Sequence, residues 1–443
     1  MTTGRPLRAG EPAATANRPL RAVVLVANTA APYSRGLRVA RSLAGAGYEV
    51  EIAAVAGPGV PHEERDGDVL TRRYQPVGRW AGWSSEAPAA SGARRRRRWG
   101  PLGGLLRRAV KALAWPVHVR GWWEGLRRDL PPADLYHACG ILTAGIALEL
   151  ARDAQRRGRQ GRVIYDVIDV ILQSNNYAAV PAPLLAFYRW RERRWVRASD
   201  AIVTVNGPIA DHLARSWRLP EPATVLLNCQ PRWEAPEPRP DLIRAATGIP
   251  PERAVVLFLG RLGRERGLEE AAEAVLRLHD TALVMLGFGS WADRLQARDS
   301  DPRYLGRHFT LPPVHPDAVP AWTASADASI IAVPANSLNQ RLSTPNKFWE
   351  SLTAGTPVVL GRDLAVMRAI VEAERLGAIA DASDPDDLAR ALRELLESPP
   401  EARAAMRDRC LAVTRSRYNW ETAVVPYLEL VARLAAFHVS PPA

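Results

Sequence analysis

The sequence of 443 residues has very little lysine, little cysteine and no long apolar run. Only Lys111 and Lys347 are lysines, so nearly all of the net charge of +12 comes from arginine. Such a bias indicates either arginine-rich composition alone or an attraction to phosphate groups. The three cysteines are far apart, which excludes a disulfide framework and a cysteine metal site. The absence of 18 consecutive apolar residues predicts that no segment spans a membrane.

Residues 1–18 have no apolar segment of the kind found in a signal peptide. We expect these residues to form a disordered leader. Together with the scarcity of cysteine, this predicts a cytoplasmic protein, either free or peripheral on the inner face of the cell membrane.

Two consecutive series of apolar strands separated by helical patterns follow the leader. Alternation of this kind builds parallel sheets, so we predict an α/β protein with two doubly wound, Rossmann-like domains facing each other across a cleft. The strands expected in the first series are 22–27, 48–55, 133–137, 162–167, 201–205 and 223–227, and those in the second are 254–260, 281–287, 328–333 and 356–360.

The boundaries follow from composition. The first domain is expected over 19–229 and the second over 244–417. Residues 230–243 contain four prolines and several charges, which predicts an interdomain linker. Residues 418–443 are expected to contain a terminal helix.

One segment of the first domain, 78–128, departs from the alternation. It holds an unbroken arginine run at 94–98, followed by apolar residues at helical spacing and by Trp115, Trp122 and Trp123. A basic amphipathic segment with tryptophans is typical of contact with an anionic membrane, here through 94–123. The alternative is a solvated loop with an ordinary helix packed on the domain. No nucleic-acid-binding module accompanies the basic residues, so we expect no nucleic-acid partner.

The second domain contains two arginines where a ligand is expected. Arg261 follows the strand 254–260 directly, and Arg266 comes five residues later, before a helical pattern. Ligands of open α/β sheets bind at the carboxyl ends of strands. Two guanidinium groups at that edge can hold a diphosphate through charge-assisted hydrogen bonds. The alternative is a pair of surface arginines in an arginine-rich chain.

The segment 343–360 favours the diphosphate interpretation. Thr344 is a suitable N-cap and Pro345 a suitable first helical residue, so a helix is expected to open at Asn346 and Lys347. Its free amides and its dipole would attract an anion. Glu350 lies one turn later on the same helix face, where its carboxylate can accept hydrogen bonds from ribose hydroxyls.

From about Arg21 to Val431 the sequence resembles the retaining glycosyltransferases of the GT-B fold, glycosyltransferase family 4, in the subgroup with a PNK-type segment. The resemblance rests on ADLYHACG (133–140), VIYDVIDV (163–170), GRLGRERGLEE (260–270), MLGFGSWADRL (285–295), ASADASIIAVP (324–334) and STPNKFWESLTAGTPVV (343–359). It implies that the first domain holds the acceptor and the second the nucleotide-sugar donor. It also implies that the terminal helix packs back on the first domain.

The resemblance implies a role for several residues. Arg261, Arg266, Asn346 and Lys347 would bind the donor diphosphate, and Glu350 would bind the ribose. The remaining cleft candidates are the glycine turn and the residues that precede the PNK helix: Gly287, Gly289, Ser343 and Thr344.

The sequence departs from the family in three places. Leu342 stands where many members have a glutamate that touches the transferred sugar. Cys139 replaces the second histidine of a His-x-His pair, which leaves His137 as the candidate catalytic residue near the reacting carbon or as a hydrogen-bonded histidine at a strand end. Asp169 stands in a segment that often reads YD-x-His-Glu and either lines the cleft or caps a helix. Gly36, at the start of the first helix, is a further cleft candidate.

These observations predict a retaining hexosyltransferase that works with a nucleoside-diphosphate sugar as co-substrate. No Asp-x-Asp pair stands in a suitable place, so neither a metal nor another cofactor is expected. The acceptor is expected to be a saccharide or a lipid-linked saccharide of the cell envelope. Two alternatives stay open: a sugar-nucleotide epimerase on the same fold, and a catalytically silent nucleotide-sugar-binding or assembly protein.

Overall fold

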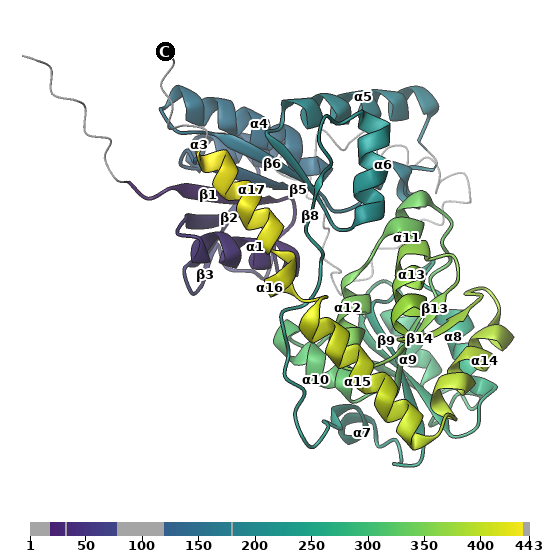
Figure 1. Ribbon diagram of the computed structural model, residues 1–443. Helices are drawn as coiled ribbons and strands as arrows, with labels where there is room; N and C mark the ends of the chain where they lie inside the picture. Colours follow the sequence, from purple (N-terminus) through teal and green to yellow (C-terminus); the bar gives the residue numbers. More distant parts are fainter. Residues whose placement is uncertain (1–17, 32, 78–118, 179, 437–443) are drawn as a thin grey trace, which may run out of the picture.

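The computed structural model describes residues 18–31, 33–77, 119–178 and 180–436. Within these residues the chain forms two parallel sheets, each covered by helices on both faces, in two domains joined at one side (Figure 1). This arrangement confirms the predicted fold class. The expected leader and residues 94–118 of the expected membrane-contact segment lie outside the described residues.

The described part of the first domain contains an eight-stranded sheet with the order β3-β4-β2-β1-β5-β6-β7-β8. All pairs are parallel except the hairpin of β3 and β4. The strands are β1 (Arg21–Val26), β2 (Glu49–Val55), β3 (Glu63–Asp66), β4 (Val69–Tyr74), β5 (Leu135–Cys139), β6 (Arg162–Val167), β7 (Ala201–Thr204) and β8 (Thr224–Val225). The helices are α1 (Ser34–Gly45), α3 (Arg120–Asp129), α4 (Ile141–Arg156), α5 (Ala182–Ala198) and α6 (Gly207–Trp217).

The side chains of β1 show why helices are needed on both faces. Val23 and Leu25 point into one apolar cluster with α3 and α4, whereas Ala22 and Val24 point into another with α1 and the carboxyl-terminal helix. Successive strand residues alternate between faces, so a wholly apolar strand requires cover on both sides. The continuous apolar run of β1 is therefore the pattern expected of a strand in the middle of the sheet, with helices on both faces.

The described second domain contains six parallel strands in the order β11-β10-β9-β12-β13-β14. They are β9 (Ala254–Arg261), β10 (Thr281–Phe288), β11 (His308–Leu311), β12 (Ala328–Ile331), β13 (Val358–Gly361) and β14 (Gly377–Ala380). Their helices are α7 (Leu242–Thr247), α8 (Leu268–Leu276), α9 (Ala292–Arg298), α10 (Val319–Ala324), α11 (Leu338–Leu342), α12 (Asn346–Thr353), α13 (Ala365–Glu374) and α14 (Pro385–Leu396). The strand order reverses between β9 and β12, and ligands of such sheets bind where the order reverses.

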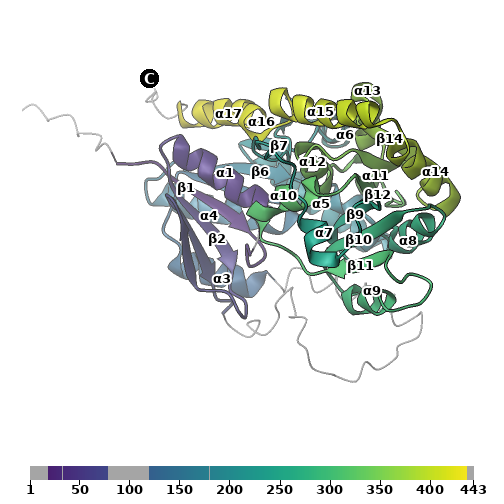
Figure 2. The same cartoon turned by 90° about the horizontal axis from the view of Figure 1, so that it is seen from below.

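Two connections link the domains. Residues 226–241 run between them without helix or strand. The chain then returns through α15 (Pro400–Ser416), α16 (Trp420–Ala423) and α17 (Val425–Ala436), which follow one another across both domains (Figure 2). Trp420, Tyr427 and Leu430 belong to the apolar cluster beneath α1, so the end of the chain completes the core of the first domain.

The described part of the basic segment differs from its expected role. Trp122, counted among the membrane-facing aromatics, is completely buried, and its indole N–H donates to the backbone oxygen of Ala54 at 2.9 Å. The segment between Arg120 and Asp129 is a helix packed on the sheet, because Gly125 lets the backbone approach Gln75 closely. The prediction that Trp122 faces a membrane was therefore wrong.

Candidate functional site

The amino end of α12 is open. Pro345, in extended backbone with ψ 158°, precedes the first helical residue Asn346, and no side chain caps the helix. Thr344 is therefore not the N-cap, which corrects the sequence prediction. Its buried hydroxyl instead accepts a hydrogen bond from Asn206 of the first domain at 3.4 Å. The first amides of α12 are left to bind an anion, which the helix dipole also favours.

Lys347 carries an unpaired charge at this helix end. Its Nζ atom is buried, has no hydrogen-bond partner among the described residues, and lies 3.9 Å above the ring centre of Phe258. Burial and, after it, the positive charge of Arg266 lower the pKa of the ammonium to about 7, although the charge of Glu350 opposes both. A buried ammonium without a partner is costly, so the site is built for a negatively charged group.

Glu350 lies one helical turn after Asn346, as predicted. Burial raises the pKa of its carboxyl to about 7, against the opposing charges of Arg38 and Lys347. No hydrogen bond or salt bridge to the Glu350 side chain occurs among the described residues. Its carboxylate is therefore available to accept hydrogen bonds from hydroxyl groups.

Arg261 and Arg266 lie at the carboxyl end of β9, beside the point where the strand order reverses. Arg261 is exposed and Arg266 is half-buried. Burial lowers the pKa of Arg266, and the charge of Arg261 lowers it further. Neither guanidinium forms a salt bridge in the described structure. The charge of Arg261 affects the pKa of Arg266, and the charges of Arg266 and Glu350 affect the pKa of Lys347. The four charged groups predicted for the donor site therefore lie in one region.

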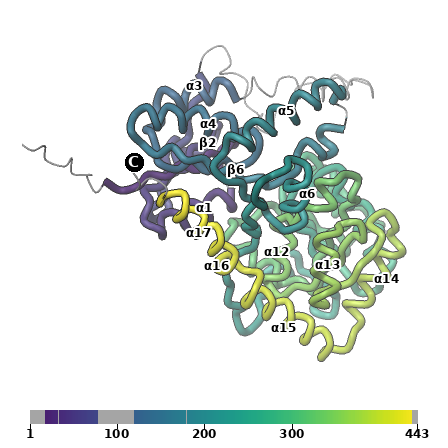
Figure 3. The backbone as a smooth tube through the Cα atoms, turned by 45° about the horizontal axis from the view of Figure 1, so that its top comes forward, coloured from purple at the N-terminus to yellow at the C-terminus, as the bar shows by residue number. Residues whose placement is uncertain are grey.

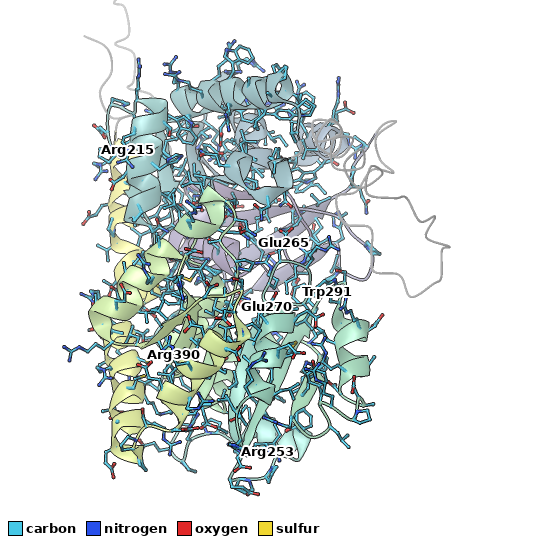
Figure 4. All side chains as sticks on the ribbon, turned by 90° about the vertical axis from the view of Figure 1, so that its right-hand side faces the viewer. Arg215, Arg253, Glu265, Glu270, Trp291 and Arg390 are labelled. Atoms are coloured by element: carbon cyan, nitrogen blue, oxygen red, sulfur yellow. The ribbon has the colours of Figure 1, made fainter. Side chains whose placement is uncertain are left out.

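The first domain contributes groups to the same region. Protein atoms crowd around Asp169 and raise the pKa of its carboxyl, while a hydrogen bond from Asn339 and the charge of Arg266 oppose this. Part of Asp169 remains exposed, as expected for a group that lines a cleft. Asn175 donates to Glu265 at 3.1 Å, and Figure 4 shows Glu265 where the two domains meet.

Asn346 is held from the first domain as well. Its amide donates to Ser34 Oγ at 3.0 Å and accepts from Asn228 at 2.6 Å. Arg38 donates to the same Asn228 at 2.7 Å and lies 5.1 Å from the ring centre of Trp420. The open helix end is thus positioned by α1 and by the connection between the domains.

The local contacts of the remaining cleft candidates explain why glycine or serine stands at these positions. A Cβ on Gly287 would lie 1.8 Å from the Gly260 oxygen, and one on Gly289 would lie 2.0 Å from the Leu262 oxygen. Both glycines therefore permit close contact between the ends of β9 and β10. A Cβ on Gly36 would meet the Tyr33 ring at 2.6 Å. Ser343 donates to the Gln340 oxygen at 3.3 Å.

His137 does not reach the cleft. Its side chain is completely buried, with Nε2 3.2 Å from Asp166 and Nδ1 3.1 Å from the Tyr427 hydroxyl of α17. Both ring nitrogens are therefore occupied inside the first domain. The prediction that His137 lies near the reacting carbon is wrong, and the alternative of a hydrogen-bonded histidine at a strand end fits.

His137, Cys139 and Asp166 also bring possible metal ligands within 4.8 Å of one another. Arg35, however, binds Asp166 through two hydrogen bonds of 2.7 and 2.9 Å. The guanidinium holds the pKa of Asp166 at about 2, although burial alone would raise it. A fixed positive charge on this carboxylate opposes a cation, so the group is best described as a buried ion-pair network.

Sequence reasoning missed Arg38, Asn228 and Asn339. One signal was present in the sequence. Arg38 lies one helical turn after Ser34, near Gly36, which was a cleft candidate at the start of the same helix. Asn228 and Asn339 lie in segments without regular periodicity or at a short helix, where sequence patterns give no direction to side chains.

Comparison with known proteins agrees with this geometry. Residues 240–410 match the family described as Glycosyl transferases group 1. Among curated proteins, the chain is 27% identical over 188 residues to the GDP-mannose-dependent alpha-(1-6)-phosphatidylinositol monomannoside mannosyltransferase of Mycolicibacterium smegmatis, covering 41% of this chain and 48% of that protein. It is 30% identical over 211 residues to the D-inositol 3-phosphate glycosyltransferase of Corynebacterium urealyticum, covering 45% and 48%. The chain thus spans about half the length of these relatives.

Solved structures match over nearly the whole chain. Sucrose-phosphate synthase from Thermosynechococcus elongatus superposes with a TM-score of 0.67 at 16% identity, covering 94% of this chain and all of that one. Anabaena Alr3699/HepE in complex with UDP and glucose gives a TM-score of 0.60 at 14% identity, covering 94% and 100%. The protein therefore has the GT-B fold of these glycosyltransferases, and its second domain is the part that matches Glycosyl transferases group 1.

Proposed function

We propose that this protein transfers a hexosyl unit from a nucleoside-diphosphate sugar to an acceptor hydroxyl. The observation that carries the proposal is the buried, unpartnered Nζ of Lys347 at the open end of α12, beside Arg266. A diphosphate would supply the missing negative partner for both groups. The match to group 1 glycosyl transferases supports this proposal.

The proposed chemistry depends on stabilising the leaving group. As the bond from the sugar to the diphosphate breaks, negative charge grows on the phosphate oxygens. Arg261, Arg266, Lys347 and the amides of α12 would stabilise that charge through hydrogen bonds and electrostatic attraction. Glu350 would accept hydrogen bonds from the ribose and fix the nucleoside relative to these cations.

We further propose retention of the anomeric configuration and independence from metal ions. The departing phosphate can take the proton of the attacking hydroxyl, so the chemistry requires neither a protein base nor a metal. NMR of the fresh product would give its anomeric configuration. Activity after exhaustive chelation is expected to stay within twofold of the untreated enzyme, and its loss on chelation with recovery on adding Mg²⁺ or Mn²⁺ would contradict this.

The acceptor would enter from the first domain. Asp169 faces Arg266 and Asn339 of the second domain, and the oxygen of Leu342 accepts a hydrogen bond from Asn206 at 2.8 Å. We propose a saccharide or a lipid-linked saccharide of the cell envelope as acceptor. The names of the two curated relatives, which refer to phosphatidylinositol monomannoside and to D-inositol 3-phosphate, support a polyhydroxylated acceptor.

The test is a thermal-shift and calorimetry panel with UDP-, GDP- and ADP-sugars. A true donor at 100 times its Kd should add about 2.7 kcal/mol of stability. Arg266→Ala should raise the Kd of that donor about 10- to 100-fold, because a charge-assisted hydrogen bond is lost. Arg264→Ala is the matched control, since Arg264 is exposed in the same loop, and should leave the Kd unchanged. Failure of every nucleotide sugar to bind would reject the proposal.

One observation favours a second candidate, a silent nucleotide-sugar-binding protein. Leu342 stands where many members of the family that the sequence resembles have a glutamate, and it packs against the core of the first domain. Transfer assays with the donor that binds would separate the two functions. Binding without transfer to any saccharide acceptor supports the silent protein. Conversion of the sugar in the absence of an acceptor would indicate an epimerase.

A further inference from the structure

The outward face of α5 carries exposed aromatic side chains. Phe187 is 45% exposed and Trp190 is 52% exposed, and their rings stack with centres 5.8 Å apart at an interplanar angle of 28°. The other exposed large apolar side chains of the described structure are scattered over separate elements: Leu242, Phe288, Leu305 and Val425. Adjacent exposed aromatics therefore distinguish α5 from the rest of the described surface.

The same helix is strongly basic. It carries Arg189, Arg191, Arg193, Arg194 and Arg197. Its one acidic residue, Glu192, is buried and accepts a hydrogen bond from Tyr165 at 2.9 Å. None of the five arginines has a salt bridge among the described residues, whereas many arginines elsewhere, such as Arg277 and Arg390, are paired. These positive charges are therefore available to an external anion.

Arginine and aromatic groups are interleaved on one face of the helix. The guanidinium of Arg194 lies 5.1 Å from the ring centre of Trp190, and that of Arg191 lies 5.8 Å from Phe187. Phe187, Trp190, Arg194 and Arg197 are spaced by three or four residues, so they share the outward side, while Glu192 and Val196 face the domain. We call Phe187, Trp190, Arg191, Arg194 and Arg197 the α5 face.

The position of α5 leaves this face away from the donor site. The helix runs along the side of the first domain that points away from the second domain (Figures 1 and 3). A flat partner could therefore contact α5 without blocking the cleft between the domains.

A hollow adjoins the α5 face. A cavity of about 430 Å³ lies between α5 and α6 and is lined in part by Arg189, Trp190, Arg193 and His212. A phosphate group held at the α5 face would thus find further donors beside it.

We propose that the α5 face docks this protein on an anionic phospholipid bilayer. Tryptophan and phenylalanine insert at the boundary between head groups and acyl chains, and arginines beside them bind lipid phosphates. A second copy of the chain would set the three arginines of the α5 face against three others, which charge repulsion opposes. The inference rests on α5 alone and does not depend on the proposed glycosyltransferase activity.

Membrane contact was expected from the sequence, but through 94–123. Trp122 of that segment is in the core, and residues 94–118 lie outside the described structure. In the described chain, no helix is long and apolar enough to cross a membrane. The α5 face therefore identifies a peripheral surface that the sequence did not point to.

The experiment is co-sedimentation of the full chain with vesicles of phosphatidylcholine, with and without 30% phosphatidylglycerol, a composition of about one anionic lipid in three. The wild type should bind the anionic vesicles and not the neutral ones. Phe187→Ser/Trp190→Ser and, separately, Arg194→Gln/Arg197→Gln should each lower the partition coefficient about tenfold or more, since each basic residue contributes about 1 kcal/mol.

Matched controls come from the second domain. Leu305 is 69% exposed, so Leu305→Ser removes an exposed apolar group elsewhere. Arg375→Gln/Arg403→Gln removes two exposed arginines that have no salt bridge in the described structure. Both controls should bind anionic vesicles like the wild type. All variants should keep the wild-type melting temperature and nucleotide-sugar affinity, which separates this test from that of the proposed function.

Several results would overturn the inference. They are failure of the wild type to bind anionic vesicles, equal binding by the α5 variants, or equal losses in the controls. Light scattering that shows a dimer abolished by Phe187→Ser/Trp190→Ser, without vesicle binding, would assign the face to a second copy. Salt-sensitive binding of single-stranded RNA that exceeds vesicle binding and is lost in the same variants would assign it to RNA.

Discussion

Lys347 and Glu350 are opposite charges one helical turn apart, yet no salt bridge joins them among the described residues. Each lies in a place where its charged form is disfavoured, and burial brings the pKa of both to about 7. Two such buried groups destabilise the folded protein when the site is empty. Their charged forms are stabilised when a ligand supplies hydrogen-bonding or oppositely charged partners. Their arrangement is typical of a ligand site that is preorganised at the expense of stability.

Glu350→Gln is expected to stabilise the folded protein in a pH-dependent way. The pKa of Glu350 is about 7 when folded and near the ordinary 4.5 when unfolded. Between these values the folded state binds more protons, so wild-type stability falls as pH rises from 4.5 to 7. Glutamine cannot ionise, so the variant should gain about 1–2 kcal/mol above pH 7 and nothing near pH 4, after discounting for partial exposure.

Chemical denaturation from pH 4 to 8 would measure this difference. Glu372→Gln is the control, because Glu372 is exposed on α13 with only a long contact to Arg368. It should change stability by less than about 0.5 kcal/mol at every pH. A constant difference between wild type and Glu350→Gln across the pH range would show that this carboxyl does not titrate as described.

The two kinds of site residue differ in how far sequence can predict them. Arg266, Lys347 and Glu350 were expected to lie in one region, and they do, because strand ends and helix starts have local patterns that fix where such side chains lie. His137 was misjudged because its environment is completed by Tyr427, 290 positions later. Arg38 was missed for the same reason, since its partners Asn228 and Trp420 come from distant segments.

The loop between β9 and α8 shows how an element fixes the donor-site arginines. Glu265 and Gly267 flank Arg266 with φ of 62° and 68°, so the backbone turns sharply at both. A Cβ on Gly267 would lie 1.7 Å from the backbone oxygen of Ala332, which follows β12. The glycine therefore brings α8 against the strand where the sheet order reverses, and it aims Arg266 at the site.

Gly267→Ala should accordingly destabilise the protein and weaken donor binding together. The new methyl group cannot fit beside backbone, and the left-handed conformation adds strain, so a loss of about 2–4 kcal/mol is expected. Gly45→Ala, at the end of α1, has nothing within 4 Å of its Cβ and should be neutral or slightly stabilising. Thermal unfolding would measure the stability of each variant, and calorimetry would measure its affinity for the donor. If Gly267→Ala had the stability and affinity of the wild type, the close contact between Gly267 and the Ala332 oxygen would be contradicted.

Elements with strong apolar periodicity were predicted well and polar ones were not. The inner strands β1, β2 and β6 agree with their predictions because every face of a central parallel strand is buried. The hairpin of β3 and β4 was missed, since β3 reads EERD and three of its four residues are exposed. An edge strand needs no apolar side chains, so only pairing with β4 determines it.

The carboxyl-terminal helix α17 belongs to the core of the first domain, although it follows the second domain in the sequence. Trp420 donates from its indole to Ser42 at 3.0 Å, and Val431 is buried among side chains of α1 and β1. The core of the first domain is therefore complete only when the last helix of the described chain has packed against it. The three helices α15 to α17 follow one another across both domains (Figure 2).

Val431→Asp should loosen the first sheet although it lies far away in sequence. Val431 is 3% exposed, so the substitution places an unpaired carboxylate in the core, at a cost of about 3 kcal/mol or more. Hydrogen exchange should then accelerate in β1 and β2, which share this core, but much less in β9 and β10. Ala432→Asp adds the same charge to the exposed neighbour on α17 and should leave exchange unchanged. Equal acceleration in both sheets would mean that the domains unfold as one unit, and none in β1 would mean that α17 does not complete the core.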